Sequence, residues 1–315
     1  NSSSQLPDIA LDKNNHPHIT WSDQGDSDAD IFYIKWDGKS WVCANGEKYE
    51  PNSENANISR NKGNSRDPSI ALDFNNKPHI AWDDFSWSTT SEIFYLRWDG
   101  LDWVTANGMK YDNTRLDANV SRNTDQSFHP SLKVDSRGYP NIAWMDYSYP
   151  NGGSIFTRWN GYNWVCSNGE QYNPITGNGA FSPSSAYNSC LVLDHLDNPH
   201  ITWSGAEDIQ YIRMKGSRAP NQTKWWDNDY RWVDSTGKTI NNEWHNSNIS
   251  TNNGYSSHPS VALDSKGMAH IVWMDDLGGN KYKILYLKNN SQNMVVQEKF
   301  KGNNEAGKMV DPKDD

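Results

Sequence analysis

The stretch from Pro68 to Trp82, P-S-I-A-L-D-F-N-N-K-P-H-I-A-W, decides the fold, because near copies of it recur along the chain. The copies begin at Pro7, Pro130, Ser189 and Pro259. The aspartates that end the first half of each copy lie roughly 60 to 70 residues apart, at Asp12, Asp73, Asp135, Asp194 and Asp264. A long fixed period indicates a repeat architecture, in which one unit cannot bury its apolar face alone and neighbouring units stack.

Each repeat predicts four short strands. In the second repeat they are Ser69–Leu72, Pro78–Trp82, Glu92–Trp98 and Trp103–Thr105. An Asn-rich turn separates the first two strands, and Asp99-Gly100 is a hairpin signal between the last two. The fourth repeat keeps Trp232-Val233 as its last strand after an insertion, and the fifth offers Met294 to Gln297.

Four antiparallel strands in each of five repeats, without helical periodicity, predict an all-β chain folded as a five-bladed β-propeller. The run S-I-A-L-D-x-x-x-x-P-H-I-x-W, followed by D-I-F-Y and W-D-G, resembles secreted bacterial propellers of the sialidase-like (BNR-like) kind, from residue 5 to about 300. The strict Asp-box of that family, S-x-D-x-G-x-T-W, is not present in any repeat. We expect one domain with blades at approximately 5–66, 67–128, 129–187, 188–257 and 258–300, and a polar tail or linker at 301–315.

Charge and hydropathy exclude several functions. The net charge of -10 and the lack of a basic stripe argue against nucleic-acid binding. No apolar run approaches the length of a membrane span. The chain begins at Asn1 without an initiator Met, so we expect a mature or trimmed piece, either a monomer or part of a larger multidomain protein. The resemblance implies a secreted or cell-surface bacterial protein.

Residues that recur in every repeat are expected to build the blade. The second predicted strand carries a histidine in four repeats, at His18, His79, His200 and His270, with Asn141 in the third. We expect these side chains to be hydrogen-bonded within each blade, the repeated aspartates to cap turns, and the tryptophans that end this strand to pack between sheets. Cys43 and Cys166 share one repeat position and are expected to be buried and unpaired.

Residues that break the repeat are candidates for a site. The position just before the first strand faces the mouth of the central channel and holds Leu6, Asp67, His129, Asn188 and His258. The last four are polar, and we predict that they bind a ligand or ion there.

The loop after the second strand of the first repeat reads D-Q-G-D-S-D-A-D. Ca²⁺ prefers six to eight oxygen ligands, and alternating aspartates on a tight loop can offer them. We therefore predict a calcium site at Asp23, Asp26, Asp28 and Asp30, with calcium the only expected cofactor.

Aromatic residues outside the repeat pattern are the second signal. Trp87 lies in the loop after the second strand of repeat two, and Tyr147 and Tyr149 lie in the matching loop of repeat three. Exposed aromatic rings stack on the apolar face of a sugar, and flanking polar groups bind its hydroxyls. Trp87 with Tyr147 is the best predicted binding pair.

The leading hypothesis is a non-catalytic extracellular propeller that binds a glycan or polysaccharide. An arabinanase-like or sialidase-like glycoside hydrolase is the alternative, and it would pair Asp67 with Asp84 or Asp146 across a sugar bond. A protein-interaction or cell-surface scaffold is a further alternative, because fold alone does not choose among these functions.

Overall fold

In the part of the chain that it describes, the computed structural model consists of β-strands and loops together with the short 3-10 turns η1 (Glu54–Ala56) and η2 (Leu116–Ala118). The structure describes residues 3–24, 28–51, 53–85, 90–147, 153–182, 186–205, 207–215, 231–240, 247–250, 254–277, 281–290 and 293–297. None of the helices in these ranges is long and apolar enough to cross a membrane.

The strands form five four-stranded antiparallel sheets, and within each sheet the strands follow one another in sequence order. The first sheet contains β1 (Ser3–Leu11), β2 (Pro17–Gln24), β3 (Ala29–Trp36) and β4 (Trp41–Val42). The second contains β5 (Ser65–Leu72), β6 (Pro78–Asp84), β7 (Glu92–Trp98) and β8 (Trp103–Val104). The third contains β9 (Ser127–Val134), β10 (Pro140–Asp146), β11 (Gly153–Trp159) and β12 (Trp164–Val165). The fourth contains β13 (Ala186–Leu193), β14 (Pro199–Gly205), β15 (Asp208–Lys215) and β16 (Arg231–Val233), and the fifth contains β17 (Ser256–Leu263), β18 (Ala269–Asp276), β19 (Tyr282–Asn290) and β20 (Asn293–Gln297).

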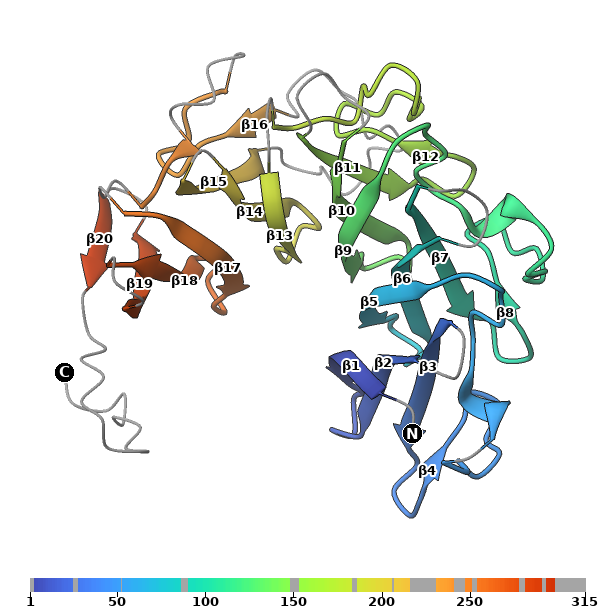
Figure 1. Cartoon of the computed structure of the whole chain (residues 1–315). Helices are drawn as coiled ribbons and strands as arrows, with labels where there is room; N and C mark the ends of the chain where they lie inside the picture. Colours follow the sequence, from blue (N-terminus) through green and yellow to red (C-terminus); the bar gives the residue numbers. More distant parts are fainter. Residues whose placement is uncertain are drawn as a thin grey trace.

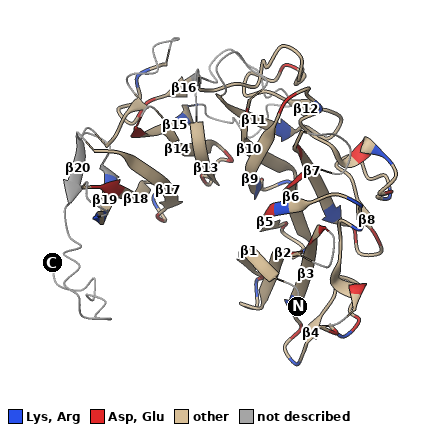
Figure 2. Cartoon of the chain, in the orientation of Figure 1, with Lys and Arg blue, Asp and Glu red and all other residues tan. Residues whose placement is uncertain are grey.

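The five sheets, called blades 1 to 5 from here on, follow one another along an arc (Figure 1). The first strand of each blade lies on the inside of the arc and the fourth on the outside. This confirms the predicted all-β repeat of four antiparallel strands. Blades 1 and 5 lie at the two ends of the arc, and charged side chains of both signs are spread over all five blades (Figure 2).

The predicted first and second strands of the blade end correctly at the turn between them, but each is too short at its opposite end. In blade 2 the expected start at Ser69 becomes Ser65, and β6 runs on to Asp84 instead of ending at Trp82. The two extensions pair with each other, because Ser65 lies opposite Asp84. The aspartate of each W-x-D motif therefore belongs to a strand and not to a loop.

Adjacent blades are held together by their apolar faces. Ile70, Ile80 and Trp82 of blade 2 pack with Ile31 and Tyr33 of blade 1 in one buried cluster. The opposite face of blade 2 packs in the same way on blade 3. The hydrophobic core thus lies between blades, where burying apolar area stabilises the fold by about 25 cal/mol per Å².

Hydrogen bonds between inner strands repeat at the same position. The backbone N–H of Ile70 donates to Asp8 Oδ2 of the preceding blade at 2.8 Å, and that of Leu132 donates to Ser69 Oγ at 3.1 Å. The N–H of Leu191 donates likewise to Ser131 Oγ. These bonds fix the register of one blade against the next.

The outer faces of the two terminal blades are uncovered. Ile9 of blade 1 is 59% exposed, whereas Ile70 at the same position of blade 2 is 2% exposed. Ile284 of blade 5 is 50% exposed, whereas the equivalent Ile93 is fully buried. The apolar surface that closes every internal junction is therefore open at both ends of the arc.

The recurring polar residues have the structural roles expected of them. His18, His79, His200 and His270 each face a tyrosine hydroxyl of the neighbouring strand through Nδ1, at 2.6–2.7 Å. Each repeated aspartate accepts two backbone N–H bonds from the turn that follows it, as Asp73 does from Asn75 and Lys77. The three cysteines are free, and Cys43 and Cys166 are buried.

The W-x-D aspartates fasten the end of the second strand. Asp146 is fully buried, and its Oδ2 accepts bonds from Trp144 Nε1 at 2.9 Å, Asn123 Nδ2 at 2.6 Å and Ser127 Oγ at 3.0 Å. Asp84 accepts the equivalent three bonds in blade 2. Each of these carboxylates therefore joins a core tryptophan to the preceding loop and to the adjacent strand.

Replacing Asp146 with alanine should lower the free energy of unfolding by about 2–4 kcal/mol, because the change leaves buried donors unsatisfied. Urea denaturation followed by tryptophan fluorescence measures this loss. The control is Asp125→Ala, which removes an exposed carboxylate that accepts a hydrogen bond from the N–H of Gln126 and should cost less than about 0.5 kcal/mol. Equal effects of the two changes would contradict the assigned role.

Stability should fall as the pH drops below about 6.5. Burial, followed by the charges of Arg97 and Lys77, lowers the pKa of His79 from 6.5 to about 3. The folded state thus binds this proton less readily than the unfolded chain, and the stabilisation present above pH 6.5 is lost toward pH 3. Between pH 7 and pH 5 the loss from His79 is about 2 kcal/mol.

The measurement is the change in melting temperature between pH 7 and pH 5. His79→Asn, which copies Asn141 of blade 3, should reduce this change, whatever its stability at pH 7. His195→Asn is the control because His195 is an exposed turn residue, and it should leave the change as in the parent. An unaltered pH dependence in His79→Asn would refute the role of this histidine.

Candidate functional site

The channel-facing position lies in a β-bulge in every blade. In blade 2, Arg66 pairs with Asp83 and Ser69 with Ala81, so the inner strand carries one extra residue opposite Trp82. The residues at the bulge have φ between 48° and 53°, which is the left-handed region: Leu6, Asp67, His129, Asn188 and His258. Non-glycine residues seldom adopt this conformation, and the bulge imposes it at the same point in all five blades.

The bulges of blades 2 and 3 border a pocket with a volume of about 380 Å³. Its lining comes from the inner ends of blades 2, 3 and 4: Arg66, Asp67, Asp83, Phe85, Phe128, His129, Met145, Tyr147 and Tyr187. Many of these positions are equivalent between blades but hold different residue types. Asp83 matches Met145, Phe85 matches Tyr147, and Arg66 matches both Phe128 and Tyr187. One composite pocket is therefore formed where the repeat is broken.

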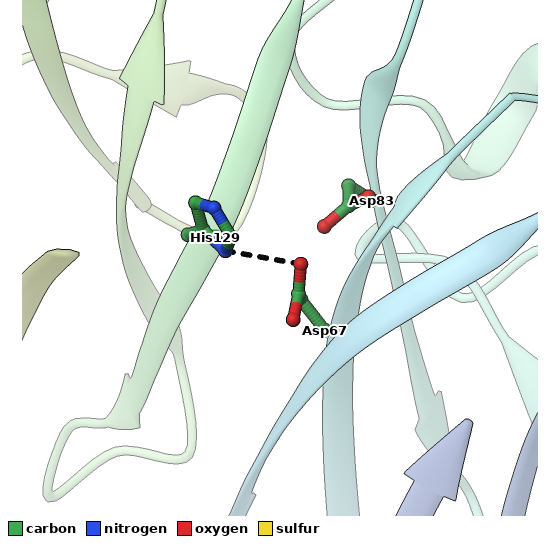
Figure 3. Close-up of side chains that lie close together, drawn as sticks. All are labelled: Asp67, Asp83 and His129. Carbon is green, nitrogen blue, oxygen red and sulfur yellow. Dashed lines mark ion pairs between the residues drawn. The ribbon is translucent and has the colours of Figure 1, made fainter. Parts of the chain in front are cut away.

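Three titratable side chains of this pocket, Asp67, Asp83 and His129, lie close together (Figure 3). His129 Nδ1 lies 3.0 Å from Asp67 Oδ2, and this ion pair joins blade 3 to blade 2. Asp83 approaches from the adjacent strand β6, and one ligand atom from each of the three residues lies within 4.8 Å of the others. Asp83 is 1% exposed, and its buried Oδ1 accepts no hydrogen bond from the described residues.

The environment drives the two carboxyl pKa values apart. Burial, and then the charge of Asp67, raise the pKa of Asp83 well above its usual value. Burial also opposes ionisation of Asp67, but the hydrogen bond and charge of His129 outweigh it and lower the Asp67 pKa. The bond to Asp67 raises the pKa of His129 against the effect of its own burial. Asp83 is therefore the weaker acid of the two carboxyl groups, and in its protonated form it donates to Asp67.

Aromatic rings form the other wall of the pocket. Phe128 contacts Phe85 on one side and Tyr147 on the other, with ring centroids 6.1 Å apart in both pairs. Tyr147 is exposed, and Tyr187 of blade 4 is within hydrogen-bonding reach of it. Burial, and then Tyr187, raise the Tyr147 pKa. The wall thus offers both apolar ring faces and phenolic hydroxyls.

The structure brings together some of the predicted ligand-binding residues. Asp67, His129 and Tyr147 line one pocket. Asn188 and His258 occupy equivalent bulges in blades 4 and 5 but do not line it, and His258 Nδ1 contacts Ser257 Oγ. Trp87 and Tyr149 lie outside the described residues, so the predicted pair of Trp87 with Tyr147 stays a prediction.

Two of the predicted calcium ligands are engaged by protein donors. Asp23 accepts bonds from Ser4 Oγ and Trp21 Nε1. Asp30 accepts bonds from Ser59 Oγ and Asn57 Nδ2, and its pKa is raised mainly by burial. Asp28 is half-buried, and Asp26 lies outside the described residues. Calcium binding by this loop stays a prediction.

Asp83 is the functional candidate that sequence reasoning missed. The sequence favours the aspartate that ends each W-x-D motif as a partner of Asp67, yet Asp84 and Asp146 are each held by three hydrogen bonds within the protein. The middle residue of the motif is Ser22, Asp83, Met145, Ser204 and Met274 in the five blades. A single carboxylate at this variable position was the signal that could have revealed it.

A larger groove of about 770 Å³ lies between the outer parts of blades 1 and 2. Its lining includes Asn45, Trp98, Trp103 and Tyr111, which belong to motifs repeated in other blades. Trp103 is engaged with Tyr33 of blade 1. Because these residues serve blade packing, the inner pocket is the better candidate for a specific site.

Comparison with known proteins shows the β-propeller fold. An ulvan lyase of a polysaccharide lyase family aligns with a TM-score of 0.56 and 11% identity over 93% of this chain and 66% of its own. The polysaccharide lyase Uly1 aligns at 0.52 and 12%, over 93% and 58%. A Hadza microbial sialidase aligns at 0.48 and 12%, over 91% and 56%. The chain thus spans about two thirds or less of each of these three proteins, and no family model or curated protein matches it.

Proposed function

We propose that this propeller binds a carbohydrate chain in the pocket around Asp67 and His129. The observation that carries the proposal is the composition of the pocket, in which several aromatic rings line the same cavity as the Asp67–His129 ion pair. A sugar ring has an apolar face, which stacks on aromatic rings, and a rim of hydroxyls that needs charged or polar partners. Both kinds of group occur here at positions where the blade repeat is broken.

The positive groups of the pocket favour a sugar that carries an acidic substituent. Arg66 lines the pocket and is exposed, and the bond to Asp67 favours the protonated form of His129. The structurally similar ulvan lyase is described as bound to -[GlcA(1-4)Rha3S]-, a uronic acid linked to a sulfated sugar. These points support an acidic polysaccharide as the first ligand to test.

Binding without cleavage is the leading form of the proposal. Paired-carboxylate hydrolysis needs two carboxyl groups about 5–9.5 Å apart, with separate roles. Asp67 and Asp83 are hydrogen-bonded to each other and their pKa values are shifted in opposite directions, so the two carboxyl groups titrate as a unit.

Glycan cleavage is the second candidate, and one observation favours it. Burial and the charge of Asp67 raise the pKa of Asp83 well above its usual value, which favours the protonated state that a proton donor to a leaving group requires. Incubation with acidic polysaccharides tests this function: new reducing ends, or ultraviolet absorbance from an unsaturated product, would show that the protein is an enzyme.

We also propose that the protein acts outside the cell or on a bacterial surface, where a polysaccharide ligand would be found.

Removing the two exposed tyrosines should weaken glycan binding. In Tyr147→Ala/Tyr187→Ala we expect affinity for the best ligand among ulvan, other acidic polysaccharides and neutral arabinan to fall about tenfold, because both ring faces are lost. Affinity electrophoresis and titration calorimetry measure the change.

The matched control is Tyr162→Ala, which removes an exposed tyrosine that lies in the turn between β11 and β12 and does not line the pocket. This variant should bind as the parent does. Binding that survives in the double variant would refute the pocket as the glycan site.

A further inference from the structure

We propose that Asp67, Asp83 and His129 bind a divalent metal ion of the zinc type. Two carboxylates and one imidazole are a donor set that suits Zn²⁺ and related transition metals, whereas Ca²⁺ prefers an all-oxygen shell. The inference goes beyond glycan binding and does not depend on it.

The distances suit a shared ion. Two ligands bound at about 2.1 Å on a tetrahedral ion lie about 3.4 Å apart. Asp67 Oδ2 and His129 Nδ1 are 3.0 Å apart, and Asp83 completes a group whose ligand atoms lie within 4.8 Å of one another. A small rotation of the three side chains would bring each atom to bonding distance.

The second observation is the buried oxygen of Asp83. A carboxylate oxygen that is removed from water needs a donor or a cation, and Asp83 Oδ1 accepts no bond from the described residues. The backbone N–H of His129 bonds to the Asp83 carboxyl and orients it toward the other two side chains. A metal ion held by the three side chains would neutralise the buried Asp83 carboxylate in place of a proton.

Three protein ligands leave coordination positions open toward the pocket. Structural zinc sites are closed by four protein ligands, and open sites accept water or a ligand oxygen. Asp67, Asp83 and His129 line the same pocket as Phe128, Tyr147 and Tyr187, so a sugar hydroxyl or carboxylate bound there can complete the shell.

Titration of chelator-treated protein with Zn²⁺ at neutral pH tests the site. We expect saturable binding of one ion per chain and a rise in melting temperature, because an ion that binds only the folded state stabilises it. Asp83→Asn and His129→Gln should each weaken binding at least about tenfold. His258→Gln should bind as the parent does, because His258 occupies the equivalent bulge of blade 5 but belongs to no group of three or more potential metal ligands in the described residues.

The structure of the parent protein in a zinc-soaked crystal tests the site even if a variant does not fold. Anomalous density between the three side chains is the expected result. Binding that is equally strong in all variants, anomalous density only elsewhere, or Asp83 bonded to Asp67 with no density between them at millimolar Zn²⁺ would each overturn the proposal.

A different observation carries a second inference, from the uncovered flanks of blades 1 and 5. We propose that the blade 5 flank of one chain docks on the blade 1 flank of a second copy. The blade 5 flank includes Val272 and Ile284, and the blade 1 flank includes Ile9 and Leu11, all of which are exposed.

The internal junctions supply the geometry of this contact. At each of them the face equivalent to the blade 5 flank packs on the face equivalent to the blade 1 flank, as blade 2 does on blade 3. The two open flanks are therefore complementary to each other and not to themselves. Head-to-tail docking continues an interface that the chain already uses, and contiguous exposed apolar surface favours it.

Two charge substitutions distinguish head-to-tail docking from other modes of association. The parent should show a mass above that of one chain in light scattering and ultracentrifugation at high concentration. Ile9→Lys and Ile284→Lys should each be monomeric, because each removes one of the two flanks. An equimolar mixture of the two should form a dimer and nothing larger, because one intact blade 5 flank meets one intact blade 1 flank. The control Leu101→Lys, in the exposed turn after β7, should behave as the parent does.

A parent that stays monomeric at high concentration, or a mixture that stays monomeric, would overturn the head-to-tail contact. Dimers of the single variants would overturn it as well, since they would show that like flanks pair or that another surface associates.

Discussion

Each blade has two apolar faces and can bury neither of them alone. The tryptophan that ends the second strand shows this dependence: Trp82 is fully buried because blade 1 covers it, whereas the equivalent Trp21 in the terminal blade is only half-buried. The inner-strand hydrogen bonds, the histidine–tyrosine pairs and the W-x-D aspartates hold each sheet so that its neighbour fits. Face-to-face stacking is therefore the constraint on which the arc, and the pocket inside it, depend.

The bulge turns this structural repeat into a means of placing functional groups. It puts one residue per blade in a left-handed conformation on the inside of the arc, whatever that residue is. Leucine in blade 1 shows that no ligand is needed for the bulge to form. Because the backbone is set by the repeat, evolution can change the side chain at this position at little cost to the fold, and the Asp67–His129 pair joins two such positions in adjacent blades.

Much of the fold could be predicted from the sequence, because repeated residues report on the blade. The turn aspartates and strand histidines were recognised as structural since each occurs once per blade. The inner ends of the strands were missed, because S-R-D-P and W-D-D have little of the apolar alternation that marks a strand. These segments are nevertheless strands, because they pair with each other across the sheet, with Ser65 opposite Asp84.

The candidate site was less predictable, because its residues come together only across blades. Asp67 and His129 were found through their shared position, but the distance between them depends on how blade 3 stacks on blade 2. Asp83 was missed because its importance comes from burial, which a polar residue in a polar stretch does not reveal. The uncovered flanks were equally invisible, because Ile9 and Ile284 have the same sequence pattern as their buried equivalents.

The chemistry of the pocket does not depend on what covers the two ends of the arc. Its charged cluster lies at the junction of blades 2 and 3, and both of these blades have neighbours on each side. The groups that hold Asp67, Asp83 and His129 in place are therefore complete within a single chain. Association through the flanks would change what lies across the arc from the pocket, and hence how long a glycan it can accept, but not the local geometry of the cluster. Metal binding and the first sugar contact should consequently be independent of protein concentration, whereas affinity for long polysaccharides should increase with association, because linked copies offer several sites to one chain.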